Sequence, residues 1–394
     1  MLEQVQKIWQ GPAIKVAVGN ETFILGQGEP NSVITVNNMS VLREFLKNPS
    51  LAFGEAYMSG DISVEGDIRD ILEGYYLSRR QLEKISSSWT LRIFRGIADT
   101  ISPKKAIENV RHHYDIGNEF YRMWLDSSMT YSCAYFLNDT DTLEQAQAQK
   151  IDLICQKARL QEGNTLLDIG CGWGGLIFHA VKTYGVKATG ITASKEQARF
   201  IREKAAKLGV EDSITIIEDD WRTLTGSYDR ITSVGMFEHV GVAQYQEFFA
   251  KWNELLTPGG VSLLHTIGVM KDAGTDKWID KYIFPGGYLP SFEQLAHHAS
   301  EGGLTTVDVE NLWQHYAKTL HHWSENFLKV RDAVVKMHDE NFARMWWLYL
   351  QGSEVSFEKG GLQLWQMVMI KDKSSKWPLN RQVSVRAPQN SLDI

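Results

Sequence analysis

The chain has 394 residues, 43% of them hydrophobic and 23% charged, which suits a globular protein of about two or three domains. Its net charge of -7 argues against nucleic-acid binding, and no apolar run reaches the ~20 residues of a membrane span. Three scattered cysteines exclude a disulfide framework or a zinc site, and the N-terminus lacks the layout of a signal peptide, so we expect a cytoplasmic protein without metal.

Residues 1–78 are predicted to form a small mixed α+β domain. The run AIKVAVGNETFILG predicts two strands around an Asn-Glu turn. Residues 40–77 have a helical pattern, with an extended stretch near residues 62–64. Because nothing here has catalytic spacing, we expect this domain to bind lipid or a partner.

A basic linker, residues 79–108, is predicted to follow. From Arg79 to Arg111, eight basic residues face only three acidic ones, a net charge of +5 in an acidic protein. Apolar residues such as Trp89 and Phe94 lie among them. A basic amphipathic segment of this kind can lie against an anionic membrane surface, and a solvated helix face or plain linker is the alternative.

The stretch HHYDIGNEFYRMWLDSSMTYSCAYF is dense in aromatic residues and contains one thiol, Cys133. It predicts either an apolar lid over the core or a lid over a ligand, into which Tyr131, Ser132 and Cys133 would point. Asp139 and Thr142 bracket the start of the next predicted helix.

The motif TLLDIGCGWGG, residues 165–175, combines a short apolar strand, a glycine turn and a following helix. This order lets the backbone approach a nucleoside ligand. It lacks the Lys-Ser/Thr of a triphosphate loop and the spacing of a dinucleotide motif, and it resembles the first motif of S-adenosylmethionine (SAM)-dependent methyltransferases. A glycine turn of another nucleotide-binding fold is the alternative.

From residue 164 on, strands alternate with helices, which predicts a parallel sheet covered on both faces. The predicted strands are residues 165–169, 187–191, 213–218, 228–234 and 260–267, and the predicted helices include residues 195–208 and 245–256. Residues 305–313 and 362–370 have strand patterns, and residues 315–351 have a helical pattern.

Ligands of such sheets bind at the carboxyl ends of the strands, so the residues there are the site candidates. Thr192 and Gln197 would offer neutral hydrogen bonds where a generic methyltransferase has an acid for the ribose. Asp220 could accept from an adenine amino group, and Trp221 could cover the adenine face. Glu238 and His265 follow adjacent strands, and two ionisable groups at one crevice favour a functional site over a structural one.

Eight motifs together resemble those of the cyclopropane-fatty-acyl-phospholipid synthases and the mycolic acid cyclopropane synthases, from about Asn109 to Met369. They are HHYDIGNEFY, TYSCAYF, LLDIGCGWGG, GITASKEQ, GMFEHVG, LLHTIG, YIFPGGYLPS and HYAKTL. The resemblance implies a Rossmann-like class I methyltransferase fold, a doubly wound α/β sheet, over residues 109–394. One departure is that Gly352-Ser353 stands where members commonly have a Cys, so we assign no role there.

The resemblance also implies the site residues. The family's bicarbonate contacts would fall on Cys133, Glu238, His265, Ile267 and Tyr316; without the resemblance, Tyr316 would be taken as a packed tyrosine. The SAM contacts would fall on Tyr131, Ser132, Asp168, Gly170, Gly172, Thr192, Gln197, Asp220 and Trp221.

The implied function is methylene transfer from SAM to the cis double bond of unsaturated acyl chains in membrane phospholipids. Bound bicarbonate would deprotonate the carbocation that methylation creates. We expect a homodimer, associated peripherally with the inner face of the membrane. The alternatives are a related methyltransferase that stops before ring closure and a lipid-binding module without turnover. Acyl length, double-bond position and headgroup preference cannot be taken from the sequence.

Overall fold

The structure is a computed structural model that describes residues 2–85, 116–271, 274–359, 361–372 and 377–380. The predicted basic linker lies mostly outside the described residues. The chain divides into two compact units. The first comprises Met1–Ala98, Thr275–Pro285 and Leu320–Gly361, and the second Asp99–Gly274, Gly286–Thr319 and Leu362–Ile394.

The first unit contains a four-stranded sheet of order β2-β1-β3-β4. Strands β1 (Ile14–Val18) and β2 (Glu21–Leu25) form the predicted antiparallel pair. Strand β3 (Ser32–Val36), which we had not predicted, is only five residues long; it pairs parallel to β1 and antiparallel to β4 (Ile62–Glu65). The helices of this part are α1 (Leu2–Ile8), α2 (Val41–Lys47), α3 (Pro49–Ser59) and α4 (Ile68–Ile85).

Later segments of the chain complete this unit. They are α11 (Lys277–Tyr282), α14 (Glu340–Glu358) and the part of α13 (Trp313–Met337) that follows Leu320. The Trp278 indole lies so close to Gly54 that a Cβ there would come within 2.2 Å of it, so this contact needs a glycine. Arg69 of α4 forms ion pairs with Glu354 and Glu358 of α14. The predicted domain boundary after residue 78 falls within α4.

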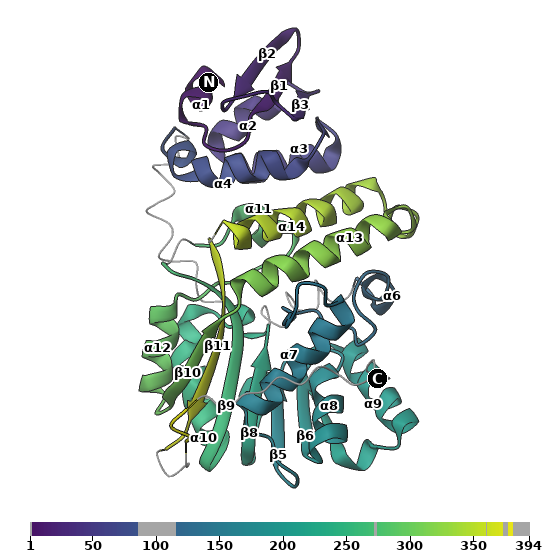
Figure 1. Cartoon of the computed structure of the whole chain (residues 1–394), viewed down its shortest axis with the longest axis vertical. Helices are drawn as coiled ribbons and strands as arrows, with labels where there is room; N and C mark the ends of the chain where they lie inside the picture. Colours follow the sequence, from purple (N-terminus) through teal and green to yellow (C-terminus); the bar gives the residue numbers. More distant parts are fainter. Residues whose placement is uncertain (1, 86–115, 272–273, 360, 373–376, 381–394) are drawn as a thin grey trace. The chain divides into compact units, whose positions relative to one another are not determined.

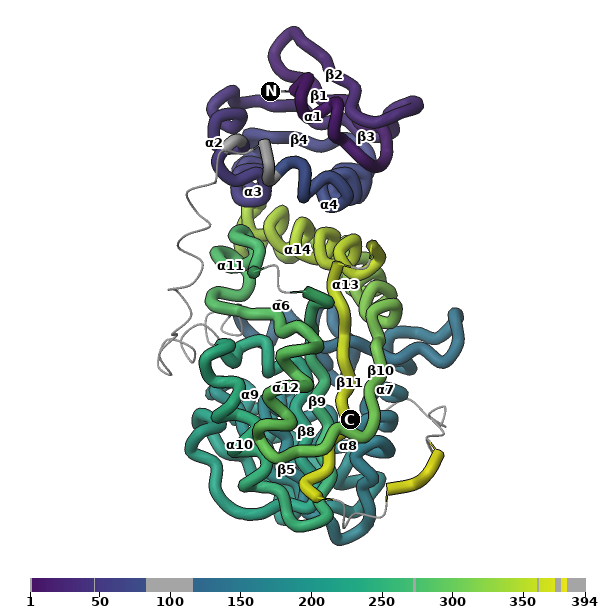
Figure 2. Tube along the Cα trace, turned by 90° about the vertical axis from the view of Figure 1, so that its left-hand side faces the viewer, coloured from purple at the N-terminus to yellow at the C-terminus, as the bar shows by residue number. Residues whose placement is uncertain are grey.

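The second unit contains a seven-stranded sheet of order β10-β11-β9-β8-β5-β6-β7 (Figure 1). Its strands are β5 (Thr165–Ile169), β6 (Lys187–Thr192), β7 (Ile214–Glu218), β8 (Tyr228–Val234), β9 (Leu256–Val269), β10 (Thr305–Asn311) and β11 (Leu362–Ile370). Strands β9-β8-β5-β6-β7 are parallel, as predicted. Strand β11, the yellow tube beside β9 and β10 in Figure 2, is antiparallel to both of these neighbours, a reversal we had not predicted.

Helices cover both faces of this sheet, which confirms the predicted doubly wound α/β class. One face carries α7 (Leu143–Lys157), α8 (Gly175–Tyr184) and α9 (Lys195–Leu208), and the other carries α10 (Tyr245–Leu255) and α12 (Phe292–Glu301) (Figure 1). Short helices α6 (Asn118–Arg122), η2 (Glu211–Ser213), η3 (Trp221–Thr223), η4 (Phe237–His239) and η5 (Val242–Gln244) lie in the connections. Within the described residues, no helix combines the length and apolar composition needed to cross a membrane.

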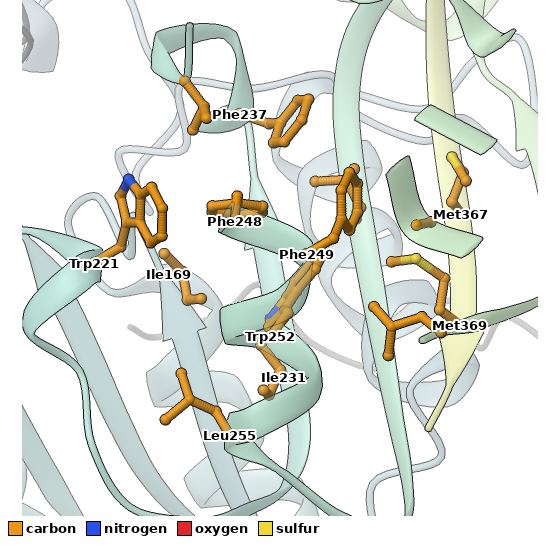
Figure 3. Close-up of a cluster of buried hydrophobic side chains, with 14 of the residues drawn as sticks. Ile169, Trp221, Ile231, Phe237, Phe248, Phe249, Trp252, Leu255, Met367 and Met369 are labelled. Carbon is orange, nitrogen blue, oxygen red and sulfur yellow. The ribbon is translucent and has the colours of Figure 1, made fainter. Parts of the chain in front are cut away.

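The core of the α10 face is aromatic. Phe248, Phe249 and Trp252 of α10 pack with Phe237 and against Met367 and Met369 of β11 (Figure 3). Trp221, from the loop after β7, packs edge-on against Phe248 at 5.0 Å between ring centroids. This core fixes the positions of the carboxyl ends of β7 and β8. The candidate active site described below lies at this edge of the sheet.

Candidate active site

One cavity lies along the carboxyl ends of the parallel strands of the second unit. Its lining includes all nine residues that the sequence predicted for SAM: Tyr131, Ser132, Asp168, Gly170, Gly172, Thr192, Gln197, Asp220 and Trp221. They come from the segment after α6, from β5 and the turn after it, from the end of β6 and the start of α9, and from the residues after β7, far apart in the chain. The structure therefore brings the nine residues predicted to bind SAM together around one cavity.

The glycine turn after β5 forms the floor of this cavity. The backbone N–H groups of Gly170 and Cys171 both donate to the carbonyl oxygen of Ile191, at 2.9 and 3.1 Å, which ties the turn to β6. Gly170 has a φ of +79°, and a Cβ there would lie 2.5 Å from the Met236 side chain. A larger residue would therefore both strain the backbone and clash.

Asp168 precedes that turn and is buried. Its carboxylate accepts a hydrogen bond of 2.8 Å from the Thr232 hydroxyl. Burial raises the pKa of Asp168 to about 6, against the lowering effects of Thr232 and of Lys150. A buried carboxylate at the cavity wall can bind a cationic group of a ligand.

The β6 and β7 side of the cavity carries hydrogen-bonding groups and an aromatic ring. The Thr192 hydroxyl donates to Gln197 Oε1 at 2.7 Å, so the two predicted ribose contacts are already joined. Asp220 pairs with Arg222 at 2.6 Å, and the Arg222 guanidinium lies 4.5 Å from the Trp221 ring centroid. Arg222 also lines the cavity and was not among the predicted residues.

A second cluster joins η4 to β9. Glu238 Oε1 accepts a hydrogen bond of 2.6 Å from the backbone N–H of Ile267, so two of the predicted anion contacts touch directly. Its other carboxylate oxygen, Oε2, is buried and has no hydrogen-bond partner among the described residues. Burial raises the pKa of Glu238 to about 7, although the bond from Ile267 opposes this.

His265 is buried on β9, paired in register with Val234 of β8. The side-chain nitrogen Nε2 of Gln366, on β11, lies 3.0 Å from His265 Nδ1. The other end of that amide, Oε1, accepts a 2.6 Å bond from Lys157, which must donate. The Gln366 amide is therefore oriented with its N–H toward His265, so His265 accepts at Nδ1 and carries its proton at Nε2.

In the part of the chain that the structure describes, the Nε2 atom of His265 is also buried without a hydrogen-bond partner. Burial and the nearby cations Lys150 and Lys157 hold the pKa of His265 well below its usual range, so the ring is neutral. The cluster thus presents one unused donor, His265 N–H, and one unused acceptor, Glu238 Oε2. Buried groups of this kind are costly unless a ligand satisfies them.

The remaining predicted anion contacts lie at the start of α13. Cys133 is buried, its Sγ 3.9 Å from the carbonyl oxygen of Leu312, to which Tyr316 N–H donates at 3.0 Å. Burial raises the pKa of the Cys133 thiol far above its usual range, so it is protonated and not a nucleophile. Tyr316 is also buried.

Sequence reasoning missed several residues of this site. Lys150 and His239 line the cavity, and Gln366 and Lys157 orient His265. Lys150, Lys157 and their Gln-rich helix look like a solvated surface in the sequence, because their polarity gives no sign of burial. His239 stands beside Glu238 in the motif GMFEHVG, and that position is the signal that could have found it.

Comparison with known proteins gives consistent matches. A family model for mycolic acid cyclopropane synthetase matches residues 101–367, and a model for a domain of unknown function matches residues 14–86. The chain is 38% identical to a "Probable fatty acid methyltransferase" of Pseudomonas putida, over 91% of each chain. It is 39% identical to the cyclopropane-fatty-acyl-phospholipid synthase of Escherichia coli K12, over 86% of this chain and 88% of the relative.

A solved structure shares this fold. It is the mycolic acid cyclopropane synthase CmaA1 complexed with SAH and CTAB, which superposes with a TM-score of 0.65 and 37% identity. The match covers 69% of this chain and 100% of that one.

Proposed function

This chain belongs to the mycolic acid cyclopropane synthetase family and is a SAM-dependent methyltransferase, and from that premise we propose that it is a cyclopropane-fatty-acyl-phospholipid synthase. It would transfer the methyl carbon of SAM to the cis double bond of an unsaturated phospholipid acyl chain. The new methyl group then loses a proton as the ring closes, and S-adenosylhomocysteine (SAH) leaves.

The observation that carries this proposal is the pair of unused buried atoms, Glu238 Oε2 and His265 Nε2. A bicarbonate ion fits them chemically, since it accepts hydrogen bonds through its oxygens and donates one through its hydroxyl. His265 would donate a hydrogen bond to the ion, and Glu238 would accept a hydrogen bond from its hydroxyl group. When bound there, bicarbonate supplies the base that removes the proton from the new methyl group.

The chain's own residues must orient and protect this reaction. Excluding water matters because water would trap the carbocation as an alcohol. Tyr131 lines the cavity and packs at 5.4 and 5.5 Å between ring centroids against Tyr121 and Trp124. Such aromatic faces stabilise a cation without reacting with it. Cys133, held protonated, does not compete as a nucleophile.

A second candidate is a fatty-acyl methyltransferase that stops before ring closure. The likeness to the Pseudomonas putida protein, whose name is that of a fatty acid methyltransferase, favours it. The two candidate reactions share every step up to the carbocation. They differ in the carbon that then loses a proton: loss from the new methyl group closes the ring, whereas loss from a neighbouring carbon leaves a double bond.

Lipid analysis of cells that express the protein tests the proposal. We expect acyl chains that gain one CH2, resist ozone and show the upfield proton signals of a cyclopropane ring. Chains that gain the same mass but are cleaved by ozone would favour the second candidate. Unchanged lipids, with folded protein that binds SAH, would overturn both and leave a lipid-binding module.

We also propose that the basic segment from Arg79 to Arg111 brings the protein, as a homodimer, to anionic membrane surfaces. Changing Arg92, Arg95, Lys104 and Lys105 together to Gln should weaken binding to anionic vesicles by about tenfold, because each cation near such a surface contributes at most about 1 kcal/mol. Turnover on detergent-dispersed lipid should fall much less. Unchanged sedimentation with vesicles would show that the segment is only a linker.

A further inference from the structure

Lys150 is a buried cation in the cavity wall without a counterion. Its side chain is 2% exposed and lines the cavity from α7. Its Nζ donates one hydrogen bond, to the Ser132 hydroxyl at 2.8 Å. Among the described residues, no carboxylate lies within 4.0 Å of it, so it forms no ion pair.

The nearest buried acids are occupied by other groups. Asp126 accepts from the backbone N–H groups of Ser128 and Thr130 at 2.9 and 3.0 Å and from the Ser128 hydroxyl. Asp168 accepts from Thr232. A buried ammonium group is costly when it has no anionic partner, so this arrangement indicates an anion that is supplied from outside the chain.

The packing of α7 fixes the position of Lys150. Helix α7 starts with a capping box at Thr142, and Ile151 and Ile154 anchor it in the core of this sheet face. Gln147, one turn before Lys150, donates at 2.8 Å to the backbone carbonyl of Ser132. Two residues of α7 therefore bind Ser132, Gln147 at its backbone carbonyl and Lys150 at its hydroxyl. Lys150 cannot turn to solvent without breaking its bond to that hydroxyl.

The order of the strands orients the ligand. Along the sheet edge, Trp221 follows β7, Thr192 is the last residue of β6, Asp168 is the second-last residue of β5, and Gly235 follows β8. A Cβ on Gly235 would lie 3.9 Å from that of Ser132, which places Ser132 and Lys150 at the β8 side. With adenosine at the β6 and β7 side, the amino-acid end of SAM reaches the side where Lys150 and Asp168 lie.

We propose that Lys150 binds the carboxylate of the methionine moiety of SAM, while Asp168 faces its ammonium group. The eight motifs of the sequence analysis do not contain Lys150, so this is a new binding residue. The proposal rests on the part of the proposed function that concerns SAM binding, and it holds whichever product the enzyme forms. Burial lowers the pKa of Lys150 to about 8 despite the opposing effects of Asp126, Cys133, Asp168 and Cys155, and a bound carboxylate would raise this pKa again.

The test compares SAM with decarboxylated SAM, which lacks only this carboxylate, by titration calorimetry on the full chain. The wild-type protein should bind SAM about ten to a hundred times more tightly, the range of a hydrogen bond between charged groups. In Lys150→Met, SAM affinity should fall by that factor, and affinity for decarboxylated SAM should hardly change. Lys150→Arg should keep part of the preference.

Gln149→Met is the matched control, since Gln149 is a buried polar residue of the same helix that accepts a hydrogen bond of 3.1 Å from the backbone N–H of Leu137 and does not line the cavity. It should keep the wild-type preference. The proposal is overturned if Lys150→Met weakens both ligands equally, which would mean a structural role through Ser132. It is also overturned if the wild-type protein binds SAM and decarboxylated SAM equally well. That measurement does not depend on whether any variant folds.

Discussion

The two faces of the seven-stranded sheet are packed in opposite ways. On one face, α10 buries Tyr245, Phe248, Phe249, Trp252 and Leu255, which form an apolar core. On the other face, 12 of the 15 residues of α7 are buried, and these include Gln147, Gln149, Lys150, Asp152 and Lys157. Apolar burial stabilises the fold, whereas buried charge destabilises it unless it is paired. The α10 face therefore holds the strand ends in place, and the α7 face adds buried polar side chains, Lys150 and Lys157 among them, to those that the strands bring to the site.

The largest effect should come from the α10 face. Trp252→Ala should lower the free energy of unfolding by about 3–5 kcal/mol, because a fully buried indole is lost and a cavity remains. Urea denaturation measures this loss. SAH affinity of the folded protein should be nearly unchanged, and a large loss of affinity at full folding would mean that the two faces are not separate in role.

Glu238→Gln should lower turnover by about 100-fold or more, the scale of losing a positioned proton-transfer partner. The amide keeps the shape and can still accept from Ile267, but its NH2 group replaces an acceptor. SAH affinity, measured by calorimetry, should stay at the wild-type level. A turnover number like that of the wild-type protein would rule out a role for this carboxylate in orienting the base.

Lys150→Met should stabilise the ligand-free protein while it weakens SAM binding. The lowering of the Lys150 pKa from 10.5 to about 8 corresponds to at most about 3 kcal/mol of unfavourable burial, and the lost bond to Ser132 offsets about 1 kcal/mol. We therefore expect a gain of about 2 kcal/mol at pH 7 in urea denaturation. Since this folded-state pKa is lowered, the gain should be largest below pH 8 and should shrink toward pH 10.5. A destabilised variant would show that Lys150 serves the fold.

Gln366→Leu should raise the bicarbonate concentration needed for half-maximal activity by about tenfold, the effect of one lost hydrogen bond in a buried site. Without Gln366 the proton of His265 is free to move to Nδ1, and Nε2 then repels an anion. The measurement uses buffer stripped of carbon dioxide and bicarbonate added back. Gln363→Leu, on the same strand but bonded to Asn311 at 2.7 Å, is the control and should change nothing.

The smallest effect concerns pH. With the pKa of Glu238 near 7, kcat/KM should be halved near pH 7 and fall tenfold for each further pH unit below it, because the protonated carboxyl cannot accept a proton. His265 faces this site but stays neutral, so it adds no second step. The residual activity of Glu238→Gln should lack this acid limb. An unchanged limb in that variant would assign the titration to another group.

Much of this protein is determined by its sequence alone. Strands such as Tyr228–Val234 and Leu362–Ile370 have the predicted bounds, because apolar periodicity and turn residues are local signals. The glycine turn is a local signal as well. The position of Glu238 and His265 at one edge follows from the rule that parallel strands end together, whereas Ile267 as an anion contact is implied only by the family resemblance.

The tertiary structure decided the rest. The sequence of α7 predicts no burial, because its Gln and Lys residues are polar and only their docking removes them from water. The protonated nitrogen of His265 depends on Gln366 and Lys157, which lie 101 and 108 positions away in the chain, and no local pattern encodes such a contact. Likewise, α14 joins the first unit rather than the second. Local signals fix which element forms, whereas the partners of a buried polar group depend on which distant elements pack around it.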